Sequence, residues 1–217
     1  MINRQYGFLS SMLERFPYLM NEWIEKQKKE VEELARDYAE GDEEVYLDTY
    51  NSEISRIDSC YNEEQLFNQA MLIMVYSYYE SSLLRLAKEC KANLARPSII
   101  ATKYGMTLDE DLQHISDFLF NIVEPLRNQL CHNNSGTLFE KNKEKAEASI
   151  HLLEQKKYIS VDNGRIISVD RNFIRKILDG EHKLLLKLAE ICGFKSQCHT
   201  YKDGKSVIYD SYDQIEK

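Results

Sequence analysis

The chain has few residues that interrupt helices, with only 8 glycines and 3 prolines among 217 residues. A β-sandwich requires many tight turns, so this scarcity argues against one and favours long helices. Long hydrophobic runs are also missing, because the longest, around 71–79, is too short to cross a bilayer. The N-terminus lacks the basic, apolar and small-residue regions of a secretory signal. We therefore expect a helical protein that does not associate with a membrane.

Cysteine is present, but not in a pattern that indicates a disulfide framework or a metal site. The five residues are odd in number and widely scattered, which predicts a reducing, cytoplasmic environment. Cys192, Cys198 and His199 have no CxxC pair and no fourth ligand at suitable spacing, so we expect no zinc. Glycine-rich phosphate loops are also missing from the sequence, and we predict no cofactor. The cysteines are Cys60, Cys90, Cys131, Cys192 and Cys198.

An excess of positive charge is lacking as well. Lys and Arg number 28 against 36 Asp and Glu, and the net charge of −8 excludes uniform attraction to nucleic acid. The acidity is concentrated in residues 1–65, which carry 7 Lys and Arg and 16 Asp and Glu. Residues 66–217 carry 21 Lys and Arg and 20 Asp and Glu, so this nearly neutral part can hold a local basic site. We expect the acidic third to pack on the core or bind a partner rather than follow RNA.

Proline, glycine and capping residues divide the chain into predicted helices. Pro17 suits a first helical turn, so a break is expected just before it. Trp23, Val31, Leu34 and Tyr38 mark one apolar face of the helix that follows. The run 70–86 is apolar nearly all round, as in a helix buried in a bundle or at a subunit interface. The expected helices are 2–15, 17–40, 45–58, 62–95, 109–132, 137–156 and 170–192.

Two short stretches interrupt the helical pattern with strand signals. The stretch 158–169 has Asn163 and Gly164 at its centre, and Asn-Gly suits the type I′ turn of a β-hairpin. A second small hairpin is expected around Asp203 and Gly204 in the polar tail. The sequence accordingly predicts an acidic helical extension at 1–60, a helical core with the first hairpin at 61–192, and a polar tail at 193–217.

The segment with the most promise for catalysis lies at the end of the predicted helix 109–132. Arg127 is followed directly by the polar Asn128 and, five positions on, by His132. Histidine can give or take a proton near neutral pH, and arginine grips phosphate and stabilises the charge that develops on it. Together these groups suffice, without a metal, for attack of an RNA 2′-hydroxyl on the adjacent phosphate.

Helical geometry sets a condition on this site. Positions five residues apart differ by about 140° around a regular helix, so Arg127 and His132 cannot lie side by side on one helix. Asn128 and His132, four apart, do share a face. A joint site requires a distorted helix end, or two copies of the helix that face each other across a dimer axis. On the residues alone a simpler role also fits, because Arg and His near a helix C-terminus complement its dipole and cap its carbonyls.

The run from Arg127 to His132, RNQLCH, resembles the Arg–polar–x3–His signature of the α-helical HEPN superfamily. The segment 76–84, in which Glu80 interrupts an apolar face, is similar to the other core HEPN helix. The run 158–167 and the helix after it are similar to the C-terminal part of some prokaryotic members. The likeness covers roughly residues 60–192 and implies an all-α, HEPN-like helical bundle with a small C-terminal β-hairpin insertion.

Many HEPN proteins are metal-independent endoribonucleases that act as dimers in toxin–antitoxin, abortive-infection and other anti-phage systems. The resemblance implies that Arg127 and His132 form the catalytic pair and that Asn128 supports them. It also implies that Glu80 is a buried partner that orients one of that pair. The implied partners are an RNA substrate, a second copy of the chain, and an antitoxin or defence-system protein. HEPN toxins silenced by tyrosine modification carry Tyr where this chain has Asn134, so the likeness does not extend to that regulation.

Two other functions fit the same sequence. A catalytically silent HEPN domain that serves as a dimerisation, RNA-binding or partner-binding module has the same fold. An acidic antitoxin or regulatory subunit that mimics nucleic acid fits residues 1–65. Cys131 is not expected to act as a nucleophile with His132, because adjacent helical positions point about 100° apart. We expect the other histidines at or near the surface and the central tyrosines in the core or an interface: His114, His151 and His182, and Tyr76, Tyr78 and Tyr79.

Overall fold

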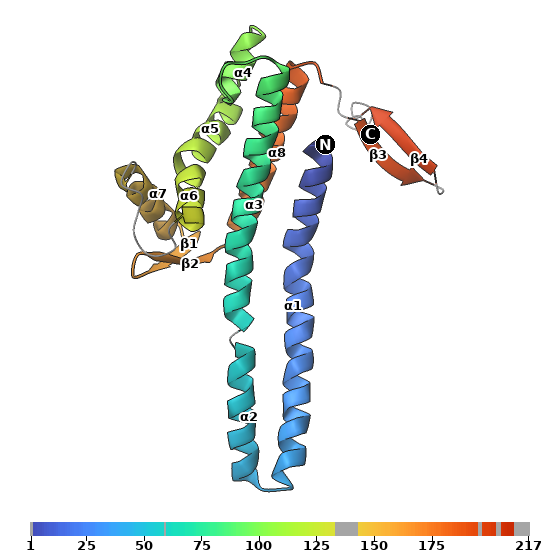
Figure 1. Cartoon of the computed structure of the whole chain (residues 1–217), viewed down its shortest axis with the longest axis vertical. Helices are drawn as coiled ribbons and strands as arrows, with labels where there is room; N and C mark the ends of the chain where they lie inside the picture. Colours follow the sequence, from blue (N-terminus) through green and yellow to red (C-terminus); the bar gives the residue numbers. More distant parts are fainter. Residues whose placement is uncertain (1, 59, 133–142, 195–196, 203–204, 211–217) are drawn as a thin grey trace.

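A long two-helix arm extends from one end of a helical bundle, and two small β-hairpins lie beside the bundle (Figure 1). The structure is a computed structural model, and it describes residues 2–58, 60–132, 143–194, 197–202 and 205–210. The predicted predominance of helix is confirmed. Within these residues, no helix combines the length and the apolar character that crossing a membrane would require.

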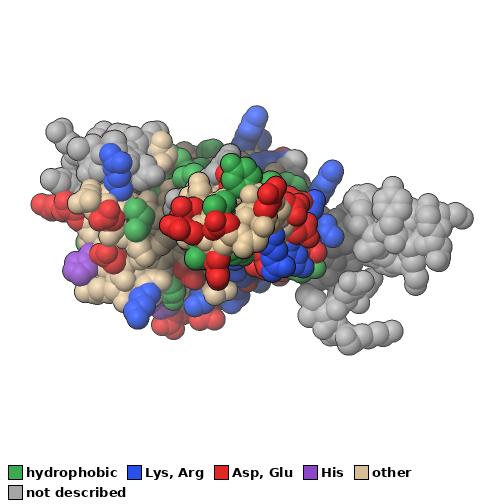
Figure 2. Space-filling view, turned by 90° about the horizontal axis from the view of Figure 1, so that it is seen from below, with side chains coloured by type: hydrophobic (Ala, Val, Ile, Leu, Met, Phe, Trp, Pro, Cys, Tyr) green, Lys and Arg blue, Asp and Glu red, His purple; other side chains and the backbone are tan. Residues whose placement is uncertain are grey.

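The arm consists of α1 (Ile2–Ala39) and α2 (Glu43–Asp58), joined by a tight turn. The expected break before Pro17 is wrong, since α1 runs through this residue without interruption. Pro17 removes one N–H donor from the helix, but it lies on the buried face, where packing offsets the loss. The arm's free end carries exposed acidic side chains on both helices (Figure 2).

The apolar face predicted for α1 is also not the face that the helix buries. Trp23, Leu34 and Tyr38 are exposed, at 44%, 55% and 72% of their surface. The buried positions are each one residue further along: Ile24, Ala35 and Ala39. One residue is a rotation of about 100°, and the small alanines on this face let two helix backbones approach closely. Packing between α1 and α2 therefore determines which face of α1 is buried, and the larger apolar side chains stay exposed to solvent.

The centre of the bundle is the pair α3 (Cys60–Glu89) and α8 (Arg171–Ile191), which pack along each other (Figure 1). The first half of α1 lies against both, and its Leu9 and Leu13 belong to the main hydrophobic core. The prediction that the middle of α3 is buried holds for most of its apolar residues. The helix ends at Glu89, earlier than the predicted end near residue 95.

A second layer covers one side of this pair. After the short helix α4 (Pro97–Lys103), one continuous helical rod is formed by α5 (Glu110–Phe118), η1 (Leu119–Val123) and α6 (Glu124–His132). The rod matches the predicted helix 109–132, and Asp109 caps its start by accepting a hydrogen bond from the backbone N–H of Leu112 at 2.9 Å. The π-helical η1 in its middle was not predicted, and neither was α4.

The predicted hairpin after this layer is confirmed. Following α7 (Lys143–Gln155), β1 (Ile159–Asp162) pairs antiparallel with β2 (Arg165–Val169). Both turn residues between the strands have positive φ, 48° at Asn163 and 75° at Gly164, as a type I′ turn requires. The hairpin is tied to α3 by Gln69, whose side-chain amide donates to the carbonyl oxygens of residues 166 and 167, each at 3.2 Å.

The tail forms a second antiparallel hairpin from β3 (Gln197–Lys202) and β4 (Lys205–Asp210), as predicted. Its expected turn at Asp203 and Gly204 lies outside the described residues, as does the first turn of the helix predicted from residue 137. The predicted helix over 170–192 is confirmed as α8, whose N-cap Asp170 accepts a hydrogen bond from the backbone N–H of Phe173 at 2.7 Å.

Candidate functional site

Arg127 on α6 is the centre of a polar cluster built from two helices. Its guanidinium forms an ion pair with the carboxylate of Glu80, which comes from α3. Its Nη1 donates a hydrogen bond to the side-chain oxygen of the adjacent Asn128 at 2.8 Å. The guanidinium carbon also lies 5.1 Å from the centre of the Tyr76 ring, within range of a cation–π contact. Three of the residues singled out from the sequence, Glu80, Arg127 and Asn128, are thus brought together.

The cluster is partly shielded from solvent. The side chain of Arg127 is 16% exposed and that of Glu80 is 41% exposed. Arg127 Nε is buried and has no hydrogen-bond partner among the described residues. A guanidinium has five N–H donors, and the bonds to Glu80 and Asn128 use one on each terminal nitrogen, so those two nitrogens each keep one donor for an anion, whereas the buried Nε is out of reach. The ion pair with Glu80 sets the orientation of the guanidinium.

His132 is the last residue of α6, and its side chain lies outside the described part of the structure. The described backbone of α6 nevertheless bears on the two arrangements expected for a joint site, a distorted helix end or a dimer. Because α6 is α-helical from Glu124 to His132, positions 127 and 132 differ by about 140° around the helix. The backbone shows no distortion up to His132, so of the two arrangements expected for a joint Arg127–His132 site, this geometry favours the one that uses a second copy of the chain.

The π-helical η1 lies immediately before α6 and determines which side of α6 faces the rest of the bundle. The backbone N–H of Glu124 bonds to the carbonyl of Leu119, five residues earlier, where a regular helix would use the residue four earlier. The hydroxyl of the buried Ser149, on α7, donates to the carbonyl oxygen of Asn121 at 3.0 Å. An extra residue in the rod turns everything after it by about 100°, so η1 determines that Arg127 faces Glu80.

A hollow of about 260 Å³ lies next to the cluster and shares Tyr76 and Glu80 with it. Arg96 contributes to its wall, stacked 4.7 Å from the centre of the Phe120 ring. Burial raises the pKa of Tyr76 and of Tyr79, so both hydroxyls stay protonated at neutral pH and can donate hydrogen bonds but not accept protons. The remaining lining residues include the carboxylates of Asp117 and Glu124.

A buried carboxyl group lies behind the cluster on α8. Glu181 is 0% exposed, and neither of its oxygens has a hydrogen-bond partner among the described residues. Burial, with a smaller contribution from the charge of Glu80, raises the pKa of Glu181 well above its usual range. Burial therefore favours the neutral, protonated form of this group over its carboxylate. Sequence reasoning missed Glu181, although its position four residues after Ile177 and four before Leu185 places it in the apolar stripe of α8.

The remaining histidines considered from the sequence take no part in the polar contacts described for this cluster. His114 and His151 are exposed and His182 is half-buried against the ring of Tyr6, at 3.9 Å between ring centres. Burial lowers the pKa of His182. Tyr76, Tyr78 and Tyr79 are buried, as expected for core residues. Among the described residues, no group of three or more His, Cys, Asp and Glu could hold a metal ion, and the side chains of Cys198 and His199 are not among them.

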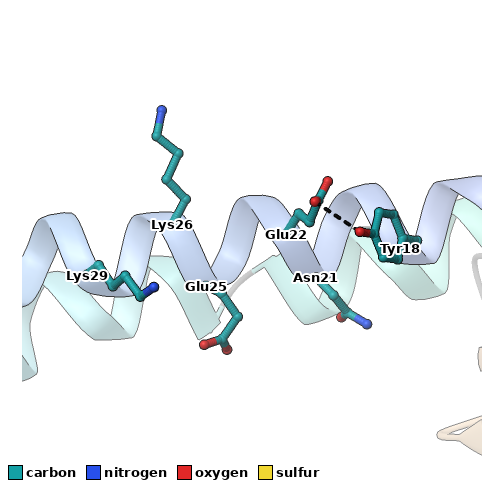
Figure 3. Close-up of a pocket in the computed structure, with 6 residues that line it drawn as sticks. All are labelled: Tyr18, Asn21, Glu22, Glu25, Lys26 and Lys29. Atoms are coloured by element: carbon teal, nitrogen blue, oxygen red, sulfur yellow. Dashed lines mark hydrogen bonds between the residues drawn. The ribbon is translucent and has the colours of Figure 1, made fainter.

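A larger hollow on the arm has a different character. Its volume is about 420 Å³, and all six lining residues come from α1 (Figure 3). Tyr18 donates a hydrogen bond to Glu22 at 3.1 Å, and both side chains stand on the surface of the helix. A ligand site requires walls from more than one element to enclose its ligand, so this surface is not a candidate site. The lining residues are Tyr18, Asn21, Glu22, Glu25, Lys26 and Lys29.

The chain matches no family model, no curated protein and no solved structure.

Proposed function

We propose that this protein is a metal-independent endoribonuclease of the HEPN type that acts as a homodimer in prokaryotic defence or in a toxin–antitoxin module. The observation that carries the proposal is the cluster at Arg127. A half-buried guanidinium, oriented by Glu80 from another helix and by the adjacent Asn128, lies just over one helical turn before His132. This is the arrangement that the Arg–polar–x3–His resemblance implies, and the helix carrying Glu80 is the one that the resemblance pairs with it.

The proposed reaction is transesterification within the RNA backbone. The 2′-hydroxyl oxygen attacks the adjacent phosphorus, and the bond from phosphorus to the 5′-oxygen of the next nucleotide breaks. The products are a 2′,3′-cyclic phosphate and a free 5′-hydroxyl. His132 accepts the proton of the attacking hydroxyl or gives one to the leaving oxygen, and Arg127 stabilises the negative charge that builds up on the phosphate. Asn128 and Glu80 position the guanidinium.

A second copy of the chain is part of the proposal. One α6 cannot present positions 127 and 132 on the same side, whereas two antiparallel copies can place the Arg127 of each near the His132 of the other. The acidic arm is then expected to point away from the RNA, because its charge repels phosphate.

The catalytically silent HEPN module is the second candidate, and one observation favours it. Arg127 is 16% exposed and its two terminal nitrogens are already engaged with Glu80 and Asn128. A guanidinium in this state can simply join α3 to α6. In that case the same dimer holds together a partner-binding or RNA-binding surface and cleaves nothing.

Incubation of the purified protein with tRNA, rRNA and mRNA, with and without added divalent metal, separates the two functions. We expect cleavage that persists with a chelator and leaves 2′,3′-cyclic phosphate ends. His132→Ala is expected to lower the rate by about 100-fold or more. Arg127→Lys, which keeps the charge but loses the planar fork, is expected to lower it by a similar factor.

Matched controls come from side chains of the same types on the exposed surface. Arg85 forms an exposed pair with Glu89, and His114 lies 3.7 Å from Glu110. Arg85→Ala and His114→Ala should leave cleavage unchanged. If the wild-type protein leaves all three RNA classes intact under every condition while remaining dimeric, the silent module is the correct function.

A further inference from the structure

Two cysteines that are far apart in the sequence meet at the end of the bundle opposite the arm. The sulfur atoms of Cys90 and Cys192 lie 2.7 Å apart, although 102 positions separate the residues in the chain. This distance is shorter than the ~3.5–4.0 Å at which unbonded carbon atoms pack. Both residues are free thiols in the structure. The contact is independent of the Arg127 cluster and of the function proposed for it.

Each sulfur is held in place by the end of a long helix. Cys90 follows the last residue of α3, and the next residue, Lys91, has a positive φ of 52°. Cys192 is the C-cap of α8, and the next residue, Gly193, has a positive φ of 75°. In both cases the chain then folds back, with Ala92 N–H bonded to Ala87 O at 2.8 Å and Phe194 N–H bonded to Ala189 O at 2.9 Å.

These two caps are Schellman motifs, in which the left-handed residue and the returning hydrogen bond fix the backbone of the last turn. The two cysteines therefore approach each other from rigid helix ends rather than from loops. Since α3 and α8 pack along each other, the meeting of the sulfur atoms does not require either helix to move. This preorganisation distinguishes the pair from two cysteines that collide by chance.

The two thiols differ in their access to solvent. Cys90 is 5% exposed, whereas Cys192 is half-buried. The hydroxyl of Tyr104, which follows α4, lies close enough to interact with both sulfurs. Cys192 is therefore the thiol that an external reagent reaches first, and Cys90 is placed behind it.

We propose that Cys90 and Cys192 are a dithiol modification site that a low-molecular-weight disulfide, such as oxidised glutathione, converts to an intramolecular disulfide. The Cys192 thiolate attacks one sulfur of the reagent, and one glutathione thiolate leaves. The Cys90 thiolate then attacks the Cys192 sulfur of this mixed disulfide, and the second glutathione thiolate leaves. The protein loses two protons and two electrons, which the reagent takes up as two thiols.

The environment of the pair controls the rate of this reaction. Burial, together with hydrogen bonding to Cys90, raises the pKa of Cys192 to about 12. Only a small fraction is then thiolate at neutral pH, and the thiolate is the attacking species. The pair is expected to survive brief exposure and to oxidise faster as the pH rises.

The experiment uses the full chain, first reduced and then incubated with oxidised glutathione at raised pH, for many times the period in which the exposed Cys131 reacts. Peptide mapping without reduction is expected to recover the peptides of Cys90 and Cys192 joined to each other, with the loss of two hydrogen atoms. The disulfide closes a loop of about 100 residues, so the Tm should rise by about 10 °C and return after treatment with dithiothreitol.

Serine variants provide the controls. Cys90→Ser and Cys192→Ser should each abolish the crosslink and the rise in Tm, and Cys131→Ser should keep both. The proposal is overturned if Cys90 and Cys192 are still thiols at the end of this prolonged incubation, when Cys131 is fully modified. It is equally overturned if Cys192 pairs with Cys198 instead, or if a stable glutathione adduct accumulates on Cys192 in the wild-type chain.

Discussion

Glu80 and Arg127 form an ion pair between α3 and α6, across 47 positions of the sequence. Glu80 interrupts an apolar face of α3, and both residues lie where the two helices meet. The pair is a direct polar link between the helix that carries Glu80 and the helix end that carries the Arg–polar–x3–His motif. It fixes the guanidinium whether that group binds phosphate or only joins the helices.

Removing this arginine should destabilise the protein more than removing an exposed one. Arg127→Ala leaves Glu80 without its partner and removes the contact with Tyr76, so we expect the free energy of unfolding to fall by about 1–3 kcal/mol. Arg85→Ala removes an exposed pair with Glu89 and should cost less than about 1 kcal/mol. Urea denaturation of both variants measures the difference. Equal losses in the free energy of unfolding would show that the Glu80–Arg127 pair stabilises the protein no more than an exposed pair does.

Glu181 should make stability depend on pH in a defined direction. Its pKa is raised in the folded protein, while in the unfolded chain it ionises near its ordinary value of 4.5. Above that pH the unfolded chain has released a proton that the folded protein retains. The free energy of unfolding therefore falls as pH rises, by at most about 1.4 kcal/mol per pH unit, until the folded pKa is reached.

Glu181→Gln removes this titration and keeps the shape of the side chain. The difference in free energy of unfolding between Glu181→Gln and the wild type should shift in favour of the variant as the pH rises from about 5 to the pH at which Glu181 ionises in the folded state. Glu144→Gln, on the exposed surface, is the matched control and should follow the wild type. Parallel stability curves for wild type and Glu181→Gln across this range would contradict the raised pKa of the buried carboxyl group.

Pro17 should be replaceable with a gain in stability. Because α1 is continuous through this position, Pro17→Ala restores a backbone N–H donor to the helix interior. The gain in helix propensity is about 3 kcal/mol, and the smaller side chain loses part of it through reduced burial, so we expect a net gain of about 1–2 kcal/mol. A loss of stability would indicate a real break at this position. Thermal unfolding followed by circular dichroism measures the effect.

Ser149 should matter through its bond to η1. Ser149→Ala removes the buried hydroxyl that donates to the carbonyl of Asn121 in a partly buried bond, and we expect a cost of about 1 kcal/mol. Ser81→Ala removes an exposed serine bond to Tyr78 O within one helix and should cost less than about 0.5 kcal/mol. If the variant is as stable as the wild type, η1 does not depend on α7.

Local sequence signals determined the parts of this fold that depend on neighbouring residues. Asn163 and Gly164 predicted their hairpin because few residues other than Gly and Asn adopt positive φ at low cost. Asp170 and Gly193 predicted the two ends of α8, since capping involves only the residues next to a helix end. The cluster of Glu80, Arg127 and Asn128 was predicted too, but from a resemblance rather than from these signals.

Tertiary packing decided the rest. Nothing near Pro17 shows that α1 continues through it, because the compensating contacts come from other helices. Trp23, Leu34 and Tyr38 form the more apolar face of α1, yet close approach of α2 favours the alanines. The π-turn in η1, the burial of Glu181 and the contact of Cys90 with Cys192 each depend on a partner distant in the chain. Periodicity along one segment carries no information about such partners.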